Sequence, residues 1–360
     1  CIITETGWMD MTSKNTFERP VGVVGAGSFG TAVANLLAKN SKVYLYARKP
    51  EVSEEMIRTG MNADQVLDKN VFPTNDLKKV GEECQVIFPV VPSANFRDMI
   101  RQLSEYIRPY HILIHGTKGL NVKGDRAKEN DFRGINDDDV LTMSQLIRQE
   151  SLAVRIGCLA GPNLAHELAE GQPAATVVAS YFDEVIAEGQ RLLRSDLFQV
   201  YGSKDLIGIE LTGVLKNIIA IAAGALRGMG YGENARSLLI SRGMIEMVYI
   251  GRMLGANAQA FLGLAGVGDL VATCSSNYSR NFTVGLRLAN GEKLEDIEAT
   301  MDETAEGVNT IRIVKNLMET KKLRAPITET LYKVINNQMT MDEALKLLMK
   351  TPFSIDVEFI

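Results

Sequence analysis

The glycine-rich run near the start of the chain limits most strongly what this sequence can fold into. A β-branched stretch at residues 20–24 leads into Gly25, Gly27 and Gly30, and a pattern with helical spacing follows immediately. Gly25 permits a tight turn, Gly27 lets a pyrophosphate approach the backbone, and Gly30 lets helix and strand pack closely. With a second strand expected at residues 42–46, the run predicts a dinucleotide-binding strand–turn–helix unit whose helix N-terminus faces the phosphates.

The end of that second strand bears on which dinucleotide is bound. An Asp or Glu about 20 residues after the first glycine would bind the ribose hydroxyls of NAD, whereas an arginine there suits the 2′-phosphate of NADP. Arg48 and Lys49 occupy this position, and no carboxylate follows the glycines before Glu51. We therefore expect NADP(H) to be accepted at least as well as NAD(H), the alternative being that Arg48 and Lys49 form only a solvated turn.

Short apolar runs, several of them separated by helical patterns, continue along the first half of the chain. We expect further strands at residues 85–91, 111–115, 155–160 and 175–179. Their alternation with helices predicts a mostly parallel, doubly wound sheet. Pro89 is unexpected inside the first of these runs, because proline donates no hydrogen bond to a strand ladder.

From about Asp205 the alternation stops, and long helical patterns run to about Lys350. The stretch from 207 to 226 is apolar nearly all round, which indicates a buried helix. The sequence therefore predicts an α/β fold with a Rossmann-type doubly wound sheet followed by an all-α domain. The expected divisions are a leader or extension at 1–19, a dinucleotide-binding domain at 20–205, a helical substrate and catalytic domain at 206–350 and a tail at 351–360.

Composition excludes several classes of protein. With 46% hydrophobic and 23% charged residues the chain is not disordered, and a net charge of −5 gives no general attraction to nucleic acid or anionic membranes. Its four cysteines are too widely spaced for a disulfide framework, which fits a reducing, cytoplasmic setting. Apolar stretches such as residues 217–226 stop short of the roughly 20 residues that a membrane helix needs, so we expect no membrane span. The charged stretch at 121–140 is expected to be an exposed loop.

A lysine inside the apolar helical run is the first candidate for chemistry. Removed from water, the Lys216 ammonium would lose solvation and its pKa would fall, so that it could exchange a proton near neutral pH. The alternative is that Lys216 reaches the surface along its aliphatic stem. The apolar surroundings and the neighbouring Asn217 favour a site.

Two further clusters could bind an anion. Lys118 follows the end of an expected strand, at the edge where open α/β sheets bind ligands, although alone it could equally be a loop lysine. A glycine-rich run ending in Asp269 precedes the triplet Ser279-Arg280-Asn281, which lies just before a helical pattern. Ser279 would cap that helix and Arg280 would hold a phosphate beside its first amide groups, the alternative being a capped turn with a solvated arginine.

Metal and nucleophile chemistry are not expected. The three histidines, His111, His115 and His166, lack the spacing of metal ligands. Cys274 has no Cys–His arrangement around it and is expected to be a small packing residue rather than a nucleophile.

Together these features resemble the NAD(P)-dependent glycerol-3-phosphate dehydrogenase family over about residues 20–345. The resemblance rests on the order and spacing of short motifs: Gly25-Ala-Gly-Ser-Phe-Gly30-Thr-Ala, Val91-Pro-Ser, Thr117-Lys-Gly119, Ala160-Gly-Pro162, Val214-Leu-Lys-Asn217, Gly263-Leu-Ala-Gly-Val-Gly-Asp269, Ser279-Arg-Asn-Phe282 and Ala305-Glu-Gly307. It implies a NAD(P)H cofactor without a metal, dihydroxyacetone phosphate and sn-glycerol 3-phosphate as substrates in phospholipid synthesis, and a homodimer.

The resemblance also implies roles for particular residues. By this resemblance, Lys216 is the proton donor and acceptor. The substrate side would be formed by Lys118, Gly161, Asn163, Asn217, Asp269, Thr273, Ser279, Arg280 and Asn281. The cofactor side would be formed by Gly25, Gly27, Ser28, Phe29, Gly30, Arg48, Phe96, Lys118, Ala165, Arg280, Thr304 and Glu306.

Three features depart from the family pattern. Asn163 stands where a serine or threonine is usual after Gly-Pro, although it can still cap a helix. The 121–140 stretch looks longer and more charged than usual, and the tail at 351–360 matches no motif.

Residues and resemblance lead to one expected mechanism. Dihydroxyacetone phosphate would lie between the domains with its phosphate on Arg280 and Asn281, and Lys216 would protonate the alkoxide that forms as hydride arrives from NAD(P)H. Lys118 would add positive charge nearby. Two alternatives are another two-domain reductase acting on a hydroxy acid or sugar nucleotide, and a regulator that binds NAD(P)H without turnover.

Overall fold

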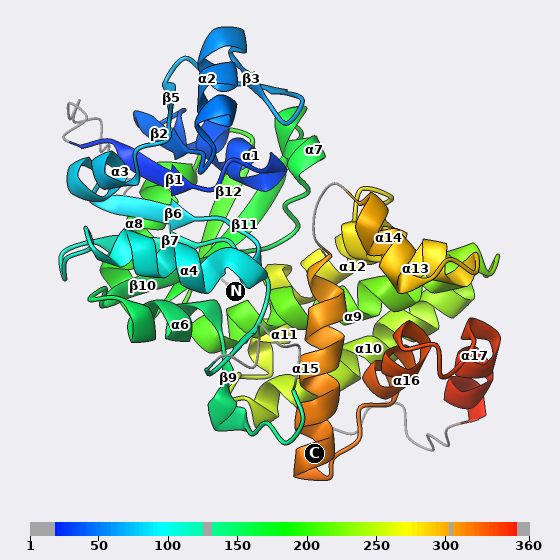
Figure 1. The fold of residues 1–360 in the computed structure, drawn as a ribbon. Helices are drawn as coiled ribbons and strands as arrows, with labels where there is room; N and C mark the ends of the chain where they lie inside the picture. Colours follow the sequence, from blue (N-terminus) through cyan, green and yellow to red (C-terminus); the bar gives the residue numbers. More distant parts are fainter. Residues whose placement is uncertain (1–18, 125–131, 302–304, 351–360) are drawn as a thin grey trace, which may run out of the picture.

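The computed structural model describes residues 19–124, 132–301 and 305–350, which form a sheet-bearing part and a helical part (Figure 1). Neighbouring strands of its main sheet are parallel with one exception, the antiparallel pair Arg155–Ala160 and Ala174–Ser180. The expected mostly parallel sheet is therefore confirmed. The strand order is β12 (Phe198–Ser203), β11 (Ala174–Ser180), β10 (Arg155–Ala160), β7 (Ile112–His115), β6 (Val86–Pro89), β1 (Val21–Val24), β2 (Val43–Tyr46) and β5 (Val71–Thr74).

Helices cover both faces of this sheet, as a doubly wound topology requires. The central strands β1 and β7 are buried along their whole length, because a parallel sheet covered on both sides has no solvent face. One face packs on α1 (Ser28–Leu37), α2 (Pro50–Thr59) and α8 (Asp183–Leu193), and the other packs on α3 (Leu77–Glu83), α4 (Ser93–Ser104) and α6 (Met143–Glu150). Smaller elements of this part are a hairpin of β3 (Met61–Asn62) and β4 (Gln65–Val66), and the short helix α7 (Ala165–Ala169).

Pro89 is the last residue of β6, which explains how a central strand tolerates it. Its carbonyl accepts from the Gly116 N–H at 3.0 Å, and the next bond to β1 is donated by the Val90 N–H at 2.8 Å. The strand is shorter than the expected 85–91, and the missing N–H falls at its end.

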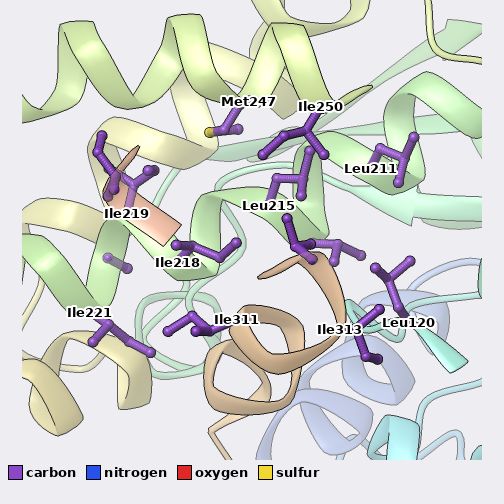
Figure 2. Close-up of a cluster of buried hydrophobic side chains, with 14 of the residues drawn as sticks. Leu120, Leu211, Leu215, Ile218, Ile219, Ile221, Met247, Ile250, Ile311 and Ile313 are labelled. Atoms are coloured by element: carbon purple, nitrogen blue, oxygen red, sulfur yellow. The ribbon is translucent and has the colours of Figure 1, made fainter. Parts of the chain in front are cut away.

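The helical part is built around one long helix, α9 (Leu206–Gly228), which is mostly apolar and is buried along nearly its whole length. Leu215 and Ile218 of this helix lie in one buried cluster with Met247 and Ile311 from two neighbouring helices (Figure 2). The other helices of this part are α10 (Glu233–Met253), α11 (Gln259–Leu262), the π-helical segment η2 (Leu264–Gly268), α12 (Asp269–Ser275), α13 (Arg280–Ala289), α14 (Leu294–Thr300), α15 (Glu306–Lys321), α16 (Pro326–Ile335) and α17 (Met341–Lys350).

Two glycines bring α13 directly against α9. A Cβ at Gly224 would lie 1.9 Å from the Phe282 carbonyl oxygen, and one at Gly285 would lie 1.8 Å from the Ile221 carbonyl oxygen. Because no larger residue fits at either position, the first half of α13 is fixed beside the C-terminal third of α9.

Among the described residues, α9 is the one helix whose length and apolar composition would suffice to cross a membrane. It is longer than the apolar stretch of 217–226 suggested, and 94% of its most apolar window is buried inside the protein. Its hydropathy is therefore accounted for by its place at the centre of the helical part.

The described parts of the 121–140 stretch, 121–124 and 132–140, are only partly the exposed loop that their charge suggested, because buried residues alternate there with exposed ones. The two ends of the stretch, β8 (Asn121–Val122) and β9 (Val140–Leu141), pair as an antiparallel ribbon. Phe132 and Ile135 are buried in the same core as α9, so a few apolar residues anchor the segment between its charged ones. Outside the described residues lie 125–131 and most of the expected leader and tail, at 1–18 and 351–360.

Candidate active site

The glycine-rich loop has the geometry that its sequence predicted. Gly25 has a φ of 124°, and a Cβ there would lie 2.2 Å from the Val90 carbonyl oxygen. A Cβ at Gly30 would lie 1.9 Å from the Gly25 carbonyl oxygen. Gly27 is the N-cap of α1, which begins at Ser28, so the helix N-terminus opens directly onto the loop.

The other expected cofactor-side residues lie in different settings. Arg48 is exposed and lies two residues after the end of β2. The Phe29 ring lies beside Gly116, whereas Phe96 is fully buried, with its ring edge-on to His115. Ala165 is the first residue of α7, and Thr304 lies outside the described residues.

Two lysines and one carboxylate meet where the two parts of the chain join. Lys216 projects from α9 and Asp269 begins α12, whereas Lys118 comes from the segment after β7. The Lys118 Nζ lies 2.8 Å from Asp269 Oδ2, and the Lys216 Nζ lies 3.1 Å from Asp269 Oδ1. Lys216 and Asp269 are only 4% and 2% exposed, so the expectation that Lys216 is buried rather than at the surface is confirmed.

Burial and the close charges shift both pKa values in this trio. Burial lowers the pKa of Lys216 to about 8, with a further lowering from Lys118 and an opposing effect from Asp269. Burial alone would raise the pKa of Asp269, but the Lys118 and Lys216 ammonium groups outweigh it and hold that pKa below its usual value. The Lys216 amine can therefore gain or lose a proton near neutral pH while its carboxylate partner stays charged.

Polar neighbours hold this trio in place. The Thr273 hydroxyl accepts from the Lys216 Nζ at 2.5 Å and donates to the Asp269 carbonyl at 2.6 Å. The Asn217 amide donates to the Lys118 carbonyl at 3.3 Å. The structure thus brings Lys216 together with four of the expected substrate-side residues.

The segment after β10 supports Lys118 from the other side. The Gly161 carbonyl accepts from the Lys118 Nζ at 3.0 Å. Asn163 does not cap α7, whose N-cap is Leu164, so that expectation is wrong. Its amide instead donates to the Ala175 carbonyl at 3.0 Å and ties the segment to β11.

The Ser279-Arg280-Asn281 triplet forms the start of α13. Ser279 is the N-cap, and its hydroxyl accepts from the Phe282 N–H at 3.3 Å, which confirms the predicted cap. Arg280 is exposed, whereas Asn281 is buried and its side-chain oxygen accepts from the Gly307 N–H at 2.8 Å. The start of α13 is thereby joined to the start of α15.

Ser93 was not singled out from the sequence, although it lies in the Val91-Pro-Ser motif. Its backbone N–H donates to Glu306 Oε1 at 2.8 Å, and its hydroxyl donates to Glu306 Oε2. Burial raises the pKa of Glu306, while Ser93 and Arg280 oppose that rise. One carboxylate at the start of α15 thus satisfies the first amide group of α4.

Other reactive groups lie outside this arrangement. Among the residues that the structure describes, no group of three or more His, Cys, Asp or Glu side chains could hold a metal ion. Burial raises the pKa of the Cys274 thiol to about 12, which supports a packing role for it. His115 Nε2 lies 2.9 Å from Glu210 Oε1 in the core behind the site.

Family models, related sequences and a solved structure that resemble this chain all belong to glycerol-3-phosphate dehydrogenases. Residues 20–186 match the family model of the NAD-dependent glycerol-3-phosphate dehydrogenase N-terminus, and residues 205–346 match the model of its C-terminus. A glycerol-3-phosphate dehydrogenase (NAD(P)+) of Pseudomonas aeruginosa is 40% identical over 351 residues, covering 96% of this chain and 98% of that protein. One from Pseudomonas putida is 38% identical over 350 residues, covering 96% and 98%. The crystal structure of glycerol-3-phosphate dehydrogenase from Coxiella burnetii superimposes with a TM-score of 0.84 at 31% identity, covering 93% of this chain and all of that one.

Proposed function

Because the chain belongs to the family of NAD-dependent glycerol-3-phosphate dehydrogenases, it is an oxidoreductase, and we propose that it interconverts dihydroxyacetone phosphate and sn-glycerol 3-phosphate with NAD(P)H. The observation that supports this most directly is the buried ion pair between Lys216 and Asp269. The pKa of Lys216, at about 8, suits reversible proton transfer. We further propose a homodimer that acts in the cytoplasm, supplies phospholipid synthesis, and needs neither a metal nor a nucleic-acid partner.

The glycine-rich loop fits a dinucleotide. Gly25 and Gly30 keep side chains out of the turn, and the N-terminus of α1 offers amide groups to a pyrophosphate. Gly27, Ser28, Phe29, Phe96, Ala165, Thr304 and Glu306 are proposed to complete the cofactor side. When bound, the reduced nicotinamide supplies the hydride.

The protein's own residues carry the proton. As the carbonyl carbon of dihydroxyacetone phosphate gains hydride, its oxygen becomes an alkoxide, and the Lys216 ammonium donates the proton that completes the alcohol. Asp269 and Thr273 fix the direction of this amine, and Lys118 holds a second positive charge nearby. In the reverse direction the neutral Lys216 amine accepts the proton.

The phosphate is proposed to lie at the start of α13. The Arg280 guanidinium would pair with it, with Ser279, Asn281 and the first amide groups of the helix beside it. Gly161, Asn163 and Asn217 would shape the wall opposite, since each contacts Lys118 or its supporting segment.

The direct test follows absorbance at 340 nm with dihydroxyacetone phosphate and each reduced cofactor in turn, alongside a panel of hydroxy acids. We expect turnover with dihydroxyacetone phosphate and NADPH at least equal to that with NADH. Turnover only with a hydroxy acid, or cofactor binding without turnover, would contradict the proposal.

Cofactor choice can be tested at Arg48. We expect Arg48→Ala to raise the KM for NADPH about tenfold relative to that for NADH, since a charge-assisted contact with the 2′-phosphate is worth about 1.5 kcal/mol. Arg58→Ala is the matched control, because Arg58 is an exposed arginine on α2 that pairs with Glu55. A strong NAD preference that Arg48→Ala leaves unchanged would refute the role of Arg48.

A further inference from the structure

The β3–β4 hairpin contacts the glycine-rich loop through two side chains that no motif in the sequence marks. Asn62 Nδ2 donates to the Ala26 carbonyl at 2.8 Å and to the Thr31 hydroxyl at 2.7 Å. Gln65 Nε2 donates to the Ser28 carbonyl at 2.8 Å. Each strand of the hairpin therefore sends one amide group to the loop, and together they fix two of its carbonyl oxygens.

The hairpin that makes these contacts contains a strained backbone turn and an unsatisfied polar atom. Its turn residues Ala63 and Asp64 have φ values of 47° and 59°, in the left-handed region that favours glycine. Gln65 is only 6% exposed, and its Oε1 has no hydrogen-bond partner among the described residues. Strained or unsatisfied groups persist where the surroundings hold them in place and are frequent at functional sites.

Fixing a carbonyl also fixes the amide that shares its peptide. The C=O and N–H of a trans peptide point in opposite directions. The Ala26 carbonyl shares a peptide with the Gly27 N–H, and the Ser28 carbonyl shares one with the Phe29 N–H. Both N–H groups are therefore turned away from the hairpin at the start of α1, where the first amides of a helix lack intrahelical partners and attract anions.

We propose that Asn62 and Gln65 are positioning residues for cofactor binding. They hold the glycine-rich loop so that the Gly27 and Phe29 N–H groups are oriented toward the dinucleotide pyrophosphate before it arrives. This inference rests on the proposed cofactor site. Because NADPH and NADH carry the same pyrophosphate, the hairpin contributes equally to the binding of both, whereas Arg48 bears only on the 2′-phosphate.

Isosteric substitutions test this role. Asn62→Asp and Gln65→Met keep the size of each side chain but remove its donor. We expect the Kd of both NADPH and NADH, measured by cofactor fluorescence, to rise about 5–20-fold in each variant. At saturating cofactor, kcat and the KM for dihydroxyacetone phosphate should stay within about twofold of the unaltered protein, a split that general destabilisation would not give.

The control is Asn70→Asp, since the Asn70 amide donates to the Ala38 carbonyl at 2.9 Å, at the other end of α1. It should leave the Kd of both cofactors unchanged. Thermal denaturation identifies any variant that does not fold. If Asn62→Asp does not fold, the cofactor Kd of Gln65→Met alone tests the proposal.

The possible outcomes separate this inference from the proposed function. An unchanged Kd in both hairpin variants would overturn the role of the hairpin and leave the function standing. A loss confined to NADPH would also overturn it, because the hairpin would then act on the 2′-phosphate. If the unaltered protein binds neither cofactor, the proposed function itself fails.

Discussion

Asp269 places its two carboxylate oxygens against two different lysines, Lys118 and Lys216. The carboxylate is the common partner in this arrangement, because removing it would leave both lysines without their counter-ion. Burial favours the neutral form of Lys216, and the carboxylate favours the charged form. A pKa of about 8 would let one amine serve both directions of the proposed reversible reaction.

Replacing this amine tests its role. We expect Lys216→Ala to lower kcat by about 10²–10⁴-fold, the usual contribution of a positioned acid or base, while the Kd for NAD(P)H is unchanged. Lys204→Ala is the control, because Lys204 is an exposed lysine just before α9 that pairs with Asp183. Near-normal turnover in Lys216→Ala would remove Lys216 from its role.

The pH dependence has a definite sign in each direction. The proposed reduction uses the Lys216 ammonium, so its rate should fall as pH rises through about 8, where the proton is lost. Oxidation needs the neutral amine, so its rate should rise through the same pH range. Initial rates in both directions between pH 6 and about 10 measure this, and parallel profiles would contradict it.

Among the elements, α13 depends most clearly on its first residues. Ser279 caps the helix, Asn281 joins it to α15, and two glycines press it against α9. Arg280 therefore projects from a rigid helix start rather than from a loop. A rigid cation beside the first amides of a helix is a suitable site for the phosphate.

Arg280→Ala should mainly weaken binding of the phosphorylated substrate. We expect the KM for dihydroxyacetone phosphate to rise by the equivalent of about 2–4 kcal/mol, as for a lost charge-assisted contact. Arg287→Ala, on the same helix, is the matched control because Arg287 pairs with Glu292 away from the site. An unchanged KM in Arg280→Ala would place the phosphate elsewhere.

Prediction from sequence succeeded for elements whose signal is local. The glycine turn, the buried helix α9 and the Ser279 cap depend on neighbouring residues and were found. The burial of Phe132 and Ile135 in the 121–140 stretch was not expected, because it depends on residues far away in the chain that share the same core, which local charge does not report.

Prediction of the site was limited in the same way. Lys216 could be found because a lysine in an apolar helix is a local anomaly. Its pairing with Asp269, and the contact of Ser93 with Glu306, join residues far apart in the chain. Only the family resemblance, which carries information about the folded protein, placed Lys118 and Asp269 in one site before the structure did.

For the whole molecule, several side-chain contacts beyond the apolar core join its two parts, among them the following three. Lys118 meets Asp269, Ser93 meets Glu306, and the His166 ring on α7 lies 4.2 Å from the Tyr278 ring. The first is in the proposed active site, and the third lies just before the start of α13. The relative placement of the two parts therefore bears directly on the chemistry.

Glu306 offers a test of this junction. We expect Glu306→Ala to lower the free energy of unfolding by about 1–3 kcal/mol, because the two Ser93 donors lose their acceptor, and also to lower kcat/KM. Glu343→Ala is the control, since Glu343 accepts from Thr340 in the same way but within a single helix start. Chemical denaturation and steady-state kinetics measure both effects, and equal behaviour of the two variants would refute a special role for the junction.

Because one carboxylate pairs with lysines from both parts of the chain, the rate of turnover also reports whether the two parts are correctly placed. Lys118 comes from the sheet-bearing part, and Asp269 and Lys216 come from the helical part, so neither portion of the chain carries the whole of the proposed reaction centre. A misplacement of about 1 Å can lower a rate by about 10²-fold. A substitution at the junction would therefore lower the rate even though every proposed catalytic side chain is retained. A small displacement of the two parts would then change turnover before it changes the spectroscopic signals of folding.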